Sequence, residues 1–407
     1  MGLESVLADI GEARLTALTK DLVAIPSENP PGDEADVARY IAQFLERCGL
    51  NPTIAEKTPG RPNVIVRLKG SRSEPTLLLT GHTDVVPAGS GWSTDPYQPA
   101  VKDGKIFGRG TCDMKGGLAC ILHVVELLQH HNVPLSGDLV CAFTVAEETG
   151  GAEGAGFVME ERLVQADMGV LLEPSDFQLV LAEEGVLWVR LTTRGTTTHT
   201  LNAATANNAV EHMTSILAAL MTQRSAILSC DARGGDRPIL SVNTIHGGDK
   251  PNVIPGECQA TIDIRIPPEC DLSMDVAKTR VSDVLAKQKE TIAGLDVDAQ
   301  FDVVARPFHQ PRDAEIVGIL ADCTAQVLGV PPHIVGPVPS TDEDSDAYHF
   351  WTKGRIPTIY FGPGRIDQAH AADEHVEILQ LVQAAQILTR VVFNTVVDGF
   401  VAREAQP

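Results

Sequence analysis

The chain is poor in aromatic side chains and in positive charge, and each shortage excludes a class of partner. Phe, Trp and Tyr make up only 4% of the 407 residues, too few for a platform on which single-stranded nucleic acid could stack. Lysine and arginine number 32 against 54 acids, so the formal net charge is −22. Because so acidic a chain repels phosphate backbones and anionic lipids, we expect no nucleic acid and no membrane as partner.

The sequence also lacks targeting and cross-linking signals. The N-terminal residues MGLESVLADIGEAR contain no basic stretch followed by an apolar run, so no signal peptide is predicted. The apolar runs are far shorter than a membrane-spanning helix. The eight cysteines include no Cys-x-x-Cys pair. In a chain of this size we interpret them as reduced, mostly buried thiols, and we expect a cytoplasmic location.

Length and hydrophobic content indicate two domains. A 43% hydrophobic fraction in 407 residues is more than one core usually contains. In the first third, helical patterns alternate with apolar strands at 63–68, 76–79 and 138–145. The last third returns to this rhythm and ends in a long helix predicted over 374–393. Alternation of this kind predicts an α/β fold, with a mixed sheet and helices on both of its faces.

The middle third has a different order of elements. Residues 258–266 alternate strictly between apolar and polar side chains, which predicts a half-buried strand. With its neighbours this strand gives the order β-α-β-β-α-β, that of a compact ferredoxin-like α+β unit. We therefore expect an inserted domain at 184–306, within a domain formed by 1–183 and 307–407.

Polar side chains able to bind metal follow the predicted strands, where open α/β sheets place their sites. His82 and Asp84 come after the strand TLLLT, and a carboxylate can hold the second nitrogen of a metal-binding imidazole. Glu147 and Glu148 come after LVCAFTVA. Adjacent carboxylates repel each other unless cations neutralise them, so one acid as ligand and the other as general base is a coherent use. A surface histidine beside a turn, and two exposed loop acids, are the alternatives.

Three further candidate ligands are spread along the chain. Asp113 lies in GRGTCDMKGG ahead of a helix, which it could otherwise cap, and Glu173 follows the strand GVLL. His370 precedes the C-terminal helix, which Asp373 could cap. His375 competes with His370, but we expect it inside that helix, where it has less freedom to meet a metal.

Together these residues predict a catalytic metal centre. The candidate ligands are His82, Asp113, Glu148, Glu173 and His370. Nitrogen and carboxylate oxygen without thiolate are typical of catalytic zinc, cobalt or manganese rather than of structural zinc. Five ligands are too many for one tetrahedral ion but suit two ions that share a carboxylate. We therefore expect two divalent metal ions, with zinc favoured, in a hydrolase.

The sequence resembles the metallopeptidase M20 family, which includes acetylornithine deacetylase, succinyl-diaminopimelate desuccinylase, aminoacylase and glutamate carboxypeptidase. The resemblance covers nearly the whole chain. It is carried, in order, by IPSENPPG, GHTDVVP, DGKIFGRGTCDMKGG, AEETGG, LEPS, RGTTTHT, KPNVIPGECQATIDIR and AHAADEHV. It implies a catalytic α/β domain with an inserted ferredoxin-like lid and dimerisation domain, and hydrolysis of an amide bond.

The resemblance also divides the metal ligands between two ions. His82 and Glu173 would bind one ion, whereas Glu148 and His370 would bind the other. Asp113 would bridge the two.

Further roles follow from the resemblance in the same way. Asp84 would orient the imidazole at position 82, and Glu147 would be the general base. His199 in RGTTTHT matches a lid histidine that helps to stabilise the oxyanion, and family dimers deliver it from the neighbouring subunit. Asn252 and Arg265 match lid positions that contact substrate. Arg265 could hold a substrate carboxylate, with a salt bridge to a lid acid as the alternative.

The subclass follows from one ligand. Family aminopeptidases and dipeptidases tend to have Asp at the position of Glu173, whereas deacylases and carboxypeptidases have Glu. We therefore expect a homodimeric deacetylase- or desuccinylase-like enzyme that cleaves a small N-acyl amino acid bearing a carboxylate. A dipeptidase or carboxypeptidase, a hydrolase of a non-peptide C–N bond and a binding protein without catalysis are the alternatives. The complete ligand set beside Glu147 argues against the last of these.

Overall fold

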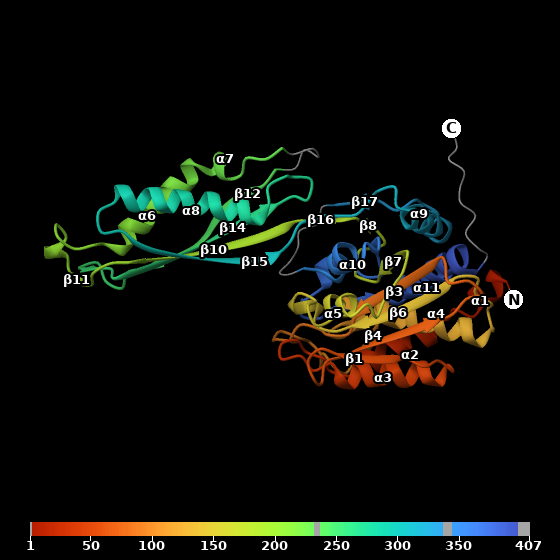
Figure 1. The fold of residues 1–407 in the computed structure, drawn as a ribbon. Coiled ribbons are helices and arrows are strands. Elements are labelled where there is room, and N and C mark those ends of the chain that lie inside the picture. The colour runs from red at the N-terminus through yellow and green to blue at the C-terminus, as the bar shows by residue number, and fades with distance from the viewer. Residues whose placement is uncertain (1, 232–236, 337–343, 398–407) are drawn as a thin grey trace. The chain divides into compact units, whose positions relative to one another are not determined.

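The structure is a computed structural model that describes residues 2–231, 237–336 and 344–397. Within these ranges the chain divides into two compact units (Figure 1). The first unit is built from two stretches, one ending at Leu181 and one beginning at Gln310. The second unit, Ala182–His309, lies between them in the sequence. Both contain helices and sheets, which confirms the predicted α/β class.

The first unit is centred on a mixed sheet in which β6, β3 and β7 are neighbours and run parallel. In spatial order its strands are β1 (Thr53–Glu56), β2 (Pro62–Leu68), β6 (Asp138–Thr144), β3 (Thr76–His82), β7 (Met168–Leu171), β18 (Thr358–Tyr360), β8 (Leu179–Val180) and β17 (Ile334–Val335). Both β3 and β6 are buried along their whole length. A parallel strand of this kind requires cover on both faces.

Helices provide that cover. The helices of this unit are α1 (Leu3–Ala8), α2 (Glu12–Val23), α3 (Ala35–Arg47), α4 (Gly116–His130), α5 (Ala155–Glu160), α9 (Glu315–Leu328), α10 (Asp346–Gly354) and α11 (Ile378–Val392). On one face Leu78 of β3 packs with Ala155 of α5 and Phe350 of α10. On the other face α4 approaches so closely that a Cβ on Gly81 would lie 2.8 Å from Leu118 Cδ2. No helix in the described ranges is long and apolar enough to cross a membrane.

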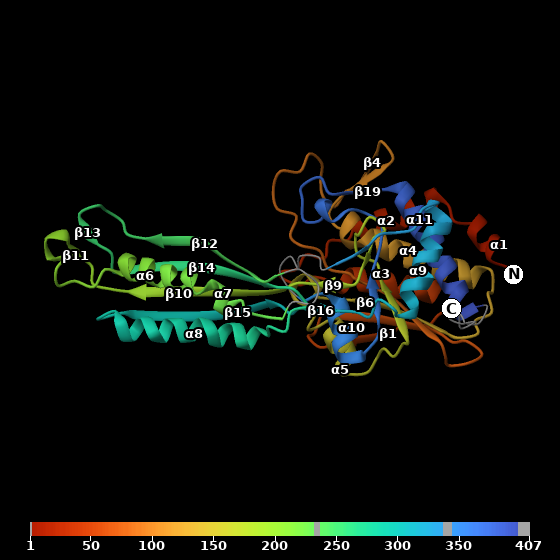
Figure 2. The ribbon, with the colours of Figure 1, turned by 90° about the horizontal axis from the view of Figure 1, so that it is seen from above.

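The second unit is an antiparallel sheet of order β12-β14-β10-β15 with α6 and α8 packed on one face (Figure 2). Its elements are β9 (Ala182–Glu183), β10 (Gly185–Arg194), β11 (Thr198–His199), α6 (Ala209–Thr222), α7 (Arg224–Ile227), β12 (Ile239–Gly247), β13 (Val253–Ile254), β14 (Glu257–Ile266), α8 (Met274–Thr291), β15 (Asp296–Ala305) and β16 (Phe308–His309). Alternate side chains of β14 are buried, and Asn208 and Ser273 cap the two main helices through their side-chain oxygens. The ferredoxin-like order expected from the sequence is confirmed.

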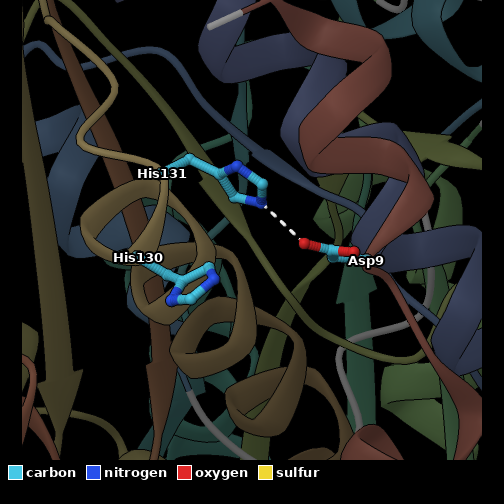
Figure 3. A group of neighbouring side chains, drawn as sticks. All are labelled: Asp9, His130 and His131. Atoms are coloured by element: carbon cyan, nitrogen blue, oxygen red, sulfur yellow. Dashed lines mark hydrogen bonds and ion pairs between the residues drawn. The ribbon is translucent and has the colours of Figure 1, made fainter.

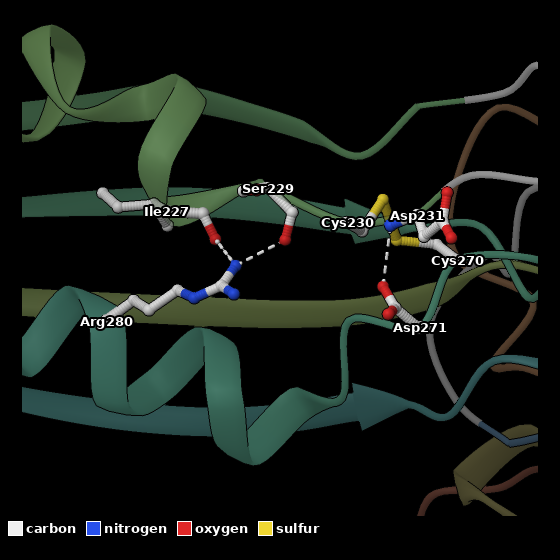
Figure 4. Close-up of a disulfide and its surroundings, with 7 residues drawn as sticks. All are labelled: Ile227, Ser229, Cys230, Asp231, Cys270, Asp271 and Arg280. Atoms are coloured by element: carbon white, nitrogen blue, oxygen red, sulfur yellow. Dashed lines mark hydrogen bonds between the residues drawn. A yellow bond between two sulfur atoms is a disulfide. The ribbon is translucent and has the colours of Figure 1, made fainter.

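The expectation that all eight cysteines are free thiols is wrong for two of them. Cys230 and Cys270 form a disulfide with their Cα atoms 5.9 Å apart (Figure 4). They are 40 residues apart in the sequence, so their spacing carried no signal. Arg280 of α8 donates hydrogen bonds to the carbonyls of Ile227 and Ser229, which holds the segment before Cys230 against that helix. The six free cysteines include five that are buried.

The C-terminal helix begins later than the sequence indicated. Residues His375–Glu377 form β19, which pairs with β5 (Lys105–Phe107), itself paired with β4 (Ala100–Lys102). His375 is therefore in a strand, not in a helix. Asp373 does not cap α11, because its Oδ1 accepts hydrogen bonds from the N–H and Oγ of Ser93. Three residues are too few to distinguish a strand period from a helical one.

Candidate metal centre

Three neighbouring parallel strands deliver acids and a histidine to one edge of the first unit's sheet. His82 is the last residue of β3, Glu147 and Glu148 follow β6, and Glu173 follows β7. These side chains converge because the carboxyl ends of parallel strands meet at the same edge. His82 Nε2 lies 3.4 Å from Glu173 Oε1 and 3.9 Å from Glu147 Oε2.

Asp113 and His370 reach the same point from loops. Asp113 Oδ1 lies 3.0 Å from His82 Nε2, and its Oδ2 lies 3.5 Å from His370 Nε2. His370 Nε2 is also 2.9 Å from Glu148 Oε2. The two oxygens of Asp113 thus face different histidines, as a bridging carboxylate must. All five ligands proposed from the sequence therefore meet at one place.

Asp84 is buried beneath these side chains and anchors the loop that carries the paired acids. Its carboxylate accepts the N–H groups of Glu147 and Glu148 at 3.2 and 3.1 Å. It also accepts a 2.8 Å hydrogen bond from Asn29 Nδ2. His82 Nδ1 lies 2.9 Å from the backbone carbonyl oxygen of Asp84 and 3.5 Å from Oδ1. Asp84 therefore fixes both the imidazole and the acidic loop.

The pKa values show how strongly the site attracts positive charge. Burial raises the pKa of Glu147 well above its usual range and that of Glu173 to about 8. Although burial acts in the opposite direction, hydrogen bonds with His370 and His82 lower the pKa of Asp113. Hydrogen bonding to Asp113 in turn raises the pKa of His370 to about 10. Crowded carboxylates in a buried site thus require cationic neighbours.

The residues fit a pair of divalent cations. Among the described residues, the buried oxygens Glu148 Oε1 and Glu173 Oε1 have no hydrogen-bond partner. Such oxygens are costly to bury unless another group satisfies them, and a cation can do so. Ligand atoms of His82, Asp113 and Glu148 lie within 4.8 Å of one another, as do those of His82, Glu147 and Glu173. Because the donors are nitrogen and oxygen without thiolate, the set suits catalytic ions.

Two other groups have donor atoms within 4.8 Å of one another but are explained by simpler interactions. Asp9, His130 and His131 lie where α1 and α4 end, and His131 Nε2 is 2.8 Å from Asp9 Oδ2 (Figure 3). Asp9 and His130 are exposed, so we interpret this group as a surface ion pair. The other group joins Asp271 to the two disulfide-bonded cysteines, whose sulfurs are not thiolates.

The three site residues predicted in the second unit lie in two separate places, His199 and Asn252 in one and Arg265 in the other. The pairing of β11 with β13 brings His199 and Asn252 together, and Thr200 N donates to Asn252 O at 3.1 Å. Arg265 is near the far end of β14, eight residues beyond its first residue, which corresponds to roughly 26 Å. Arg265 Nε lies 3.1 Å from both carboxylate oxygens of Asp263, the lid-acid salt bridge considered as its alternative.

Three residues near the ligands had no role assigned from the sequence. Asn29 lies in the motif IPSENPPG, which was quoted for the resemblance without a role for this residue. Arg109 and Glu374 form an ion pair at 2.6 Å whose side chains are 2% and 0% exposed. Both lie in motifs quoted above, and 265 positions separate them, so only the folded chain shows the contact.

Comparisons with known proteins agree with this geometry. The profile of Peptidase family M20/M25/M40 matches residues 78–394. The N-formyl-4-amino-5-aminomethyl-2-methylpyrimidine deformylase of Halalkalibacterium halodurans is 28% identical, over 96% of this chain and 97% of that protein. The acetylornithine deacetylase of Aliivibrio fischeri is 29% identical, over 91% and 95%.

Solved structures share the fold. Aminopeptidase PepT from Bacillus cereus superposes with a TM-score of 0.75 at 22% identity, covering 94% of this chain and 98% of its own. The M20 family metallo-carboxypeptidase Sso-CP2 from Sulfolobus solfataricus gives 0.73 at 20% identity, covering 93% and 98%.

Proposed function

The chain belongs to peptidase family M20/M25/M40, whose members hydrolyse amide and related C–N bonds, and we propose that it removes a short acyl group from a small amino-acid-like substrate. One observation carries this proposal: five side chains with nitrogen and oxygen donors, Asp113 among them, meet at one place, where two buried carboxylate oxygens lack a hydrogen-bond partner among the described residues. The two relatives named above, a deformylase and a deacetylase, point to a short acyl group. Glu rather than Asp at position 173 is consistent with that choice.

We assign the ligands to two divalent cations. His82 and Glu173 belong to one, Glu148 and His370 to the other, and Asp113 to both. The mixed donor set favours zinc, with cobalt and manganese as alternatives. When bound, such a pair lowers the pKa of a water molecule and polarises the amide carbonyl.

Glu147 is the general base in this proposal. Its side chain is 17% exposed, against 5% for Glu148 and 3% for Glu173, so it is the acid that water and substrate reach most readily. The hydrogen bond from its backbone N–H to Asp84 fixes its position. Glu147 accepts a proton from the attacking water and delivers it to the amine nitrogen as the C–N bond breaks.

His199 and Asn252 act on the substrate of a second copy of the chain in this proposal. They lie at the end of their unit opposite the β9–β16 pair, through which the unit joins the rest of the chain. His199 donates a hydrogen bond to the developing oxyanion. We propose a homodimer formed through the lid, 184–306. The edge strand β12 supports this homodimer. No described strand pairs with its outer edge, which is therefore open to a strand of a second copy, and its residue Ile245 is 50% exposed.

The amine released by hydrolysis is an amino acid if Arg265 binds a carboxylate of the substrate. The bidentate geometry of a guanidinium suits that role. The salt bridge to Asp263 weakens this assignment and favours a second candidate, an N-formyl group on a heteroaromatic amine that carries no carboxylate. The similarity to the deformylase supports the same candidate.

We propose a cytoplasmic location because most cysteines are free and buried. The Cys230–Cys270 disulfide is more typical of an oxidising compartment, so its redox state in cells tests this assignment.

A substrate panel tests the proposed function. The purified chain is stripped with a chelator and reloaded with zinc, cobalt or manganese. Turnover is then measured on N-acetyl and N-succinyl amino acids, an N-formyl heteroaromatic amine and unblocked dipeptides. We expect the highest kcat/KM on an acylated amine and no turnover in the stripped protein. Faster cleavage of dipeptides would transfer the assignment to a dipeptidase, and hydrolysis that survives metal removal would contradict it.

A further inference from the structure

A buried ion pair connects the two loops that supply Asp113 and His370. Glu374 and Arg109 are almost completely buried, and Arg109 Nη1 lies 2.6 Å from Glu374 Oε2. Their loops are adjacent because β19 pairs with β5, and Gly108 N also donates to Glu374 O at 3.0 Å. Charges buried this deeply are costly unless hydrogen bonds offset the cost, so the partners of the two side chains indicate what they do. Among the described residues Arg109 Nε has no hydrogen-bond partner, and the contacts of Arg109 are made by its two Nη atoms.

The Glu374 carboxylate closes the turn that carries Asp113. Its Oε1 accepts the N–H groups of Cys112 and Asp113 at 2.8 and 3.0 Å. Its Oε2 accepts the N–H of Gly110 at 3.0 Å in addition to Arg109. The backbone of Asp113 is therefore held directly by this carboxylate.

The Arg109 guanidinium holds the other loop. It donates to Ala371 O at 3.3 Å and makes longer contacts with His370 O and Ala88 O, at 3.5 and 3.4 Å. Its charge lies 5.1 Å from the centre of the Trp92 ring. The His370 backbone has φ of 60°, in the left-handed region that non-glycine residues rarely adopt. A backbone of this kind persists only when its surroundings hold it.

We propose that Arg109 and Glu374 are positioning residues that hold Asp113 and His370 at the spacing needed to share one cation. This inference rests on the proposed function. It bears most on the cation assigned to Glu148 and His370, because both loop ligands, Asp113 and His370, belong to that cation. The other cation takes two ligands, His82 and Glu173, from the ends of central strands, whose positions the sheet already fixes.

The test compares metal binding by three variants of the full chain. In Glu374→Gln the new side chain is nearly the same size as glutamate. Its NH2 group, however, must face one of the two pairs of N–H donors that the carboxylate oxygens accept, and it cannot accept their hydrogen bonds. Arg109→Lys keeps the charge and loses the fork, in which Nη1 reaches Glu374 and Nη2 reaches the carbonyl oxygen of His370. Asp138→Asn is the matched control, because Asp138 likewise accepts from an arginine, Arg67, and from a backbone N–H, at the end of the sheet remote from the site.

Zinc stoichiometry and affinity are measured by competition with a chromophoric chelator, and the metal-free proteins are unfolded thermally. We expect the wild-type chain to bind two ions. Glu374→Gln should bind the ion assigned to Glu148 and His370 about 10–100-fold more weakly, with Arg109→Lys intermediate. The other ion should be affected less, because Asp113 is the one ligand it takes from these loops. At limiting zinc kcat falls with unchanged KM, and excess zinc restores it. Asp138→Asn should lower the unfolding temperature without changing either affinity.

Each other result has a separate meaning. Wild-type affinity for both ions in Glu374→Gln and Arg109→Lys would overturn the positioning role. Equal weakening of both ions, in proportion to the loss of metal-free stability, would also overturn it by showing a purely structural effect. If Glu374→Gln does not fold, Arg109→Lys alone decides between these results. Failure of the wild-type chain to bind two ions would instead refute the proposed function.

Discussion

Replacing Glu147 with glutamine removes the proposed base while keeping its shape. Glu147 is not assigned to either cation, and Asp84 still accepts its backbone N–H, so the loop and both ions should stay in place. Loss of a positioned general base costs about 10²–10⁴-fold in rate, or roughly 3–5 kcal/mol of transition-state stabilisation. We therefore expect kcat of Glu147→Gln to fall by about three orders of magnitude at full metal occupancy.

A second substitution separates the proton-transfer role from a packing role. Glu147→Asp retains a carboxylate but withdraws it by one methylene, and a displacement of about 1 Å can cost roughly 10²-fold in rate. The assay is steady-state kinetics on the best acylated substrate, with the metal content of each sample measured in parallel. The reasoning is refuted if Glu147→Gln keeps more than about a tenth of the wild-type kcat, or if it loses an ion.

Three further expectations follow. Chelation should abolish hydrolysis and lower the midpoint of thermal unfolding by roughly 5–10 °C. An ion present at 100 times its Kd stabilises the fold by about 2.7 kcal/mol, and chelation removes that stabilisation. An unchanged midpoint would show that the buried oxygens do not bind metal. Asp84→Asn should weaken metal affinity about 10–100-fold, because an amide cannot accept hydrogen bonds from Asn29 and two backbone N–H groups together. Competition with a chelator measures this affinity, and a wild-type value would contradict the expectation. Reduction of Cys230–Cys270, which closes a loop spanning 40 residues, should destabilise the second unit by about 4 kcal/mol, and denaturation with and without reductant measures the difference.

The fold was predictable where one periodicity extends over many residues. The alternation along 258–266 identified β14, and the apolar runs at 76–79 and 138–145 identified β3 and β6. The candidate ligands were predictable for a related reason, since polar residues that follow parallel strands converge at one edge. Their roles as ligands stay predictions that metal binding must test.

The remaining features depend on contacts between distant parts of the chain. Arg109 and Glu374 meet only because β5 pairs with β19, and β19 is too short to leave a periodic signal. The pairing of Cys230 with Cys270 has no spacing rule to indicate it. The charge pattern of DIR left two partners open for Arg265, and only coordinates show its contact with Asp263.

The division of the first unit into two stretches has a consequence for synthesis. Four of the proposed ligands are translated by residue 173, whereas His370 follows about 200 residues later, a delay of roughly 10–40 s at common ribosomal rates. The helix α11, which packs against α4 and α2, emerges later still. A nascent chain therefore exposes an acidic, incomplete ligand cluster and an uncovered helical surface until translation is nearly finished. Chaperones and scarce cations would both encounter the chain before these two features are complete.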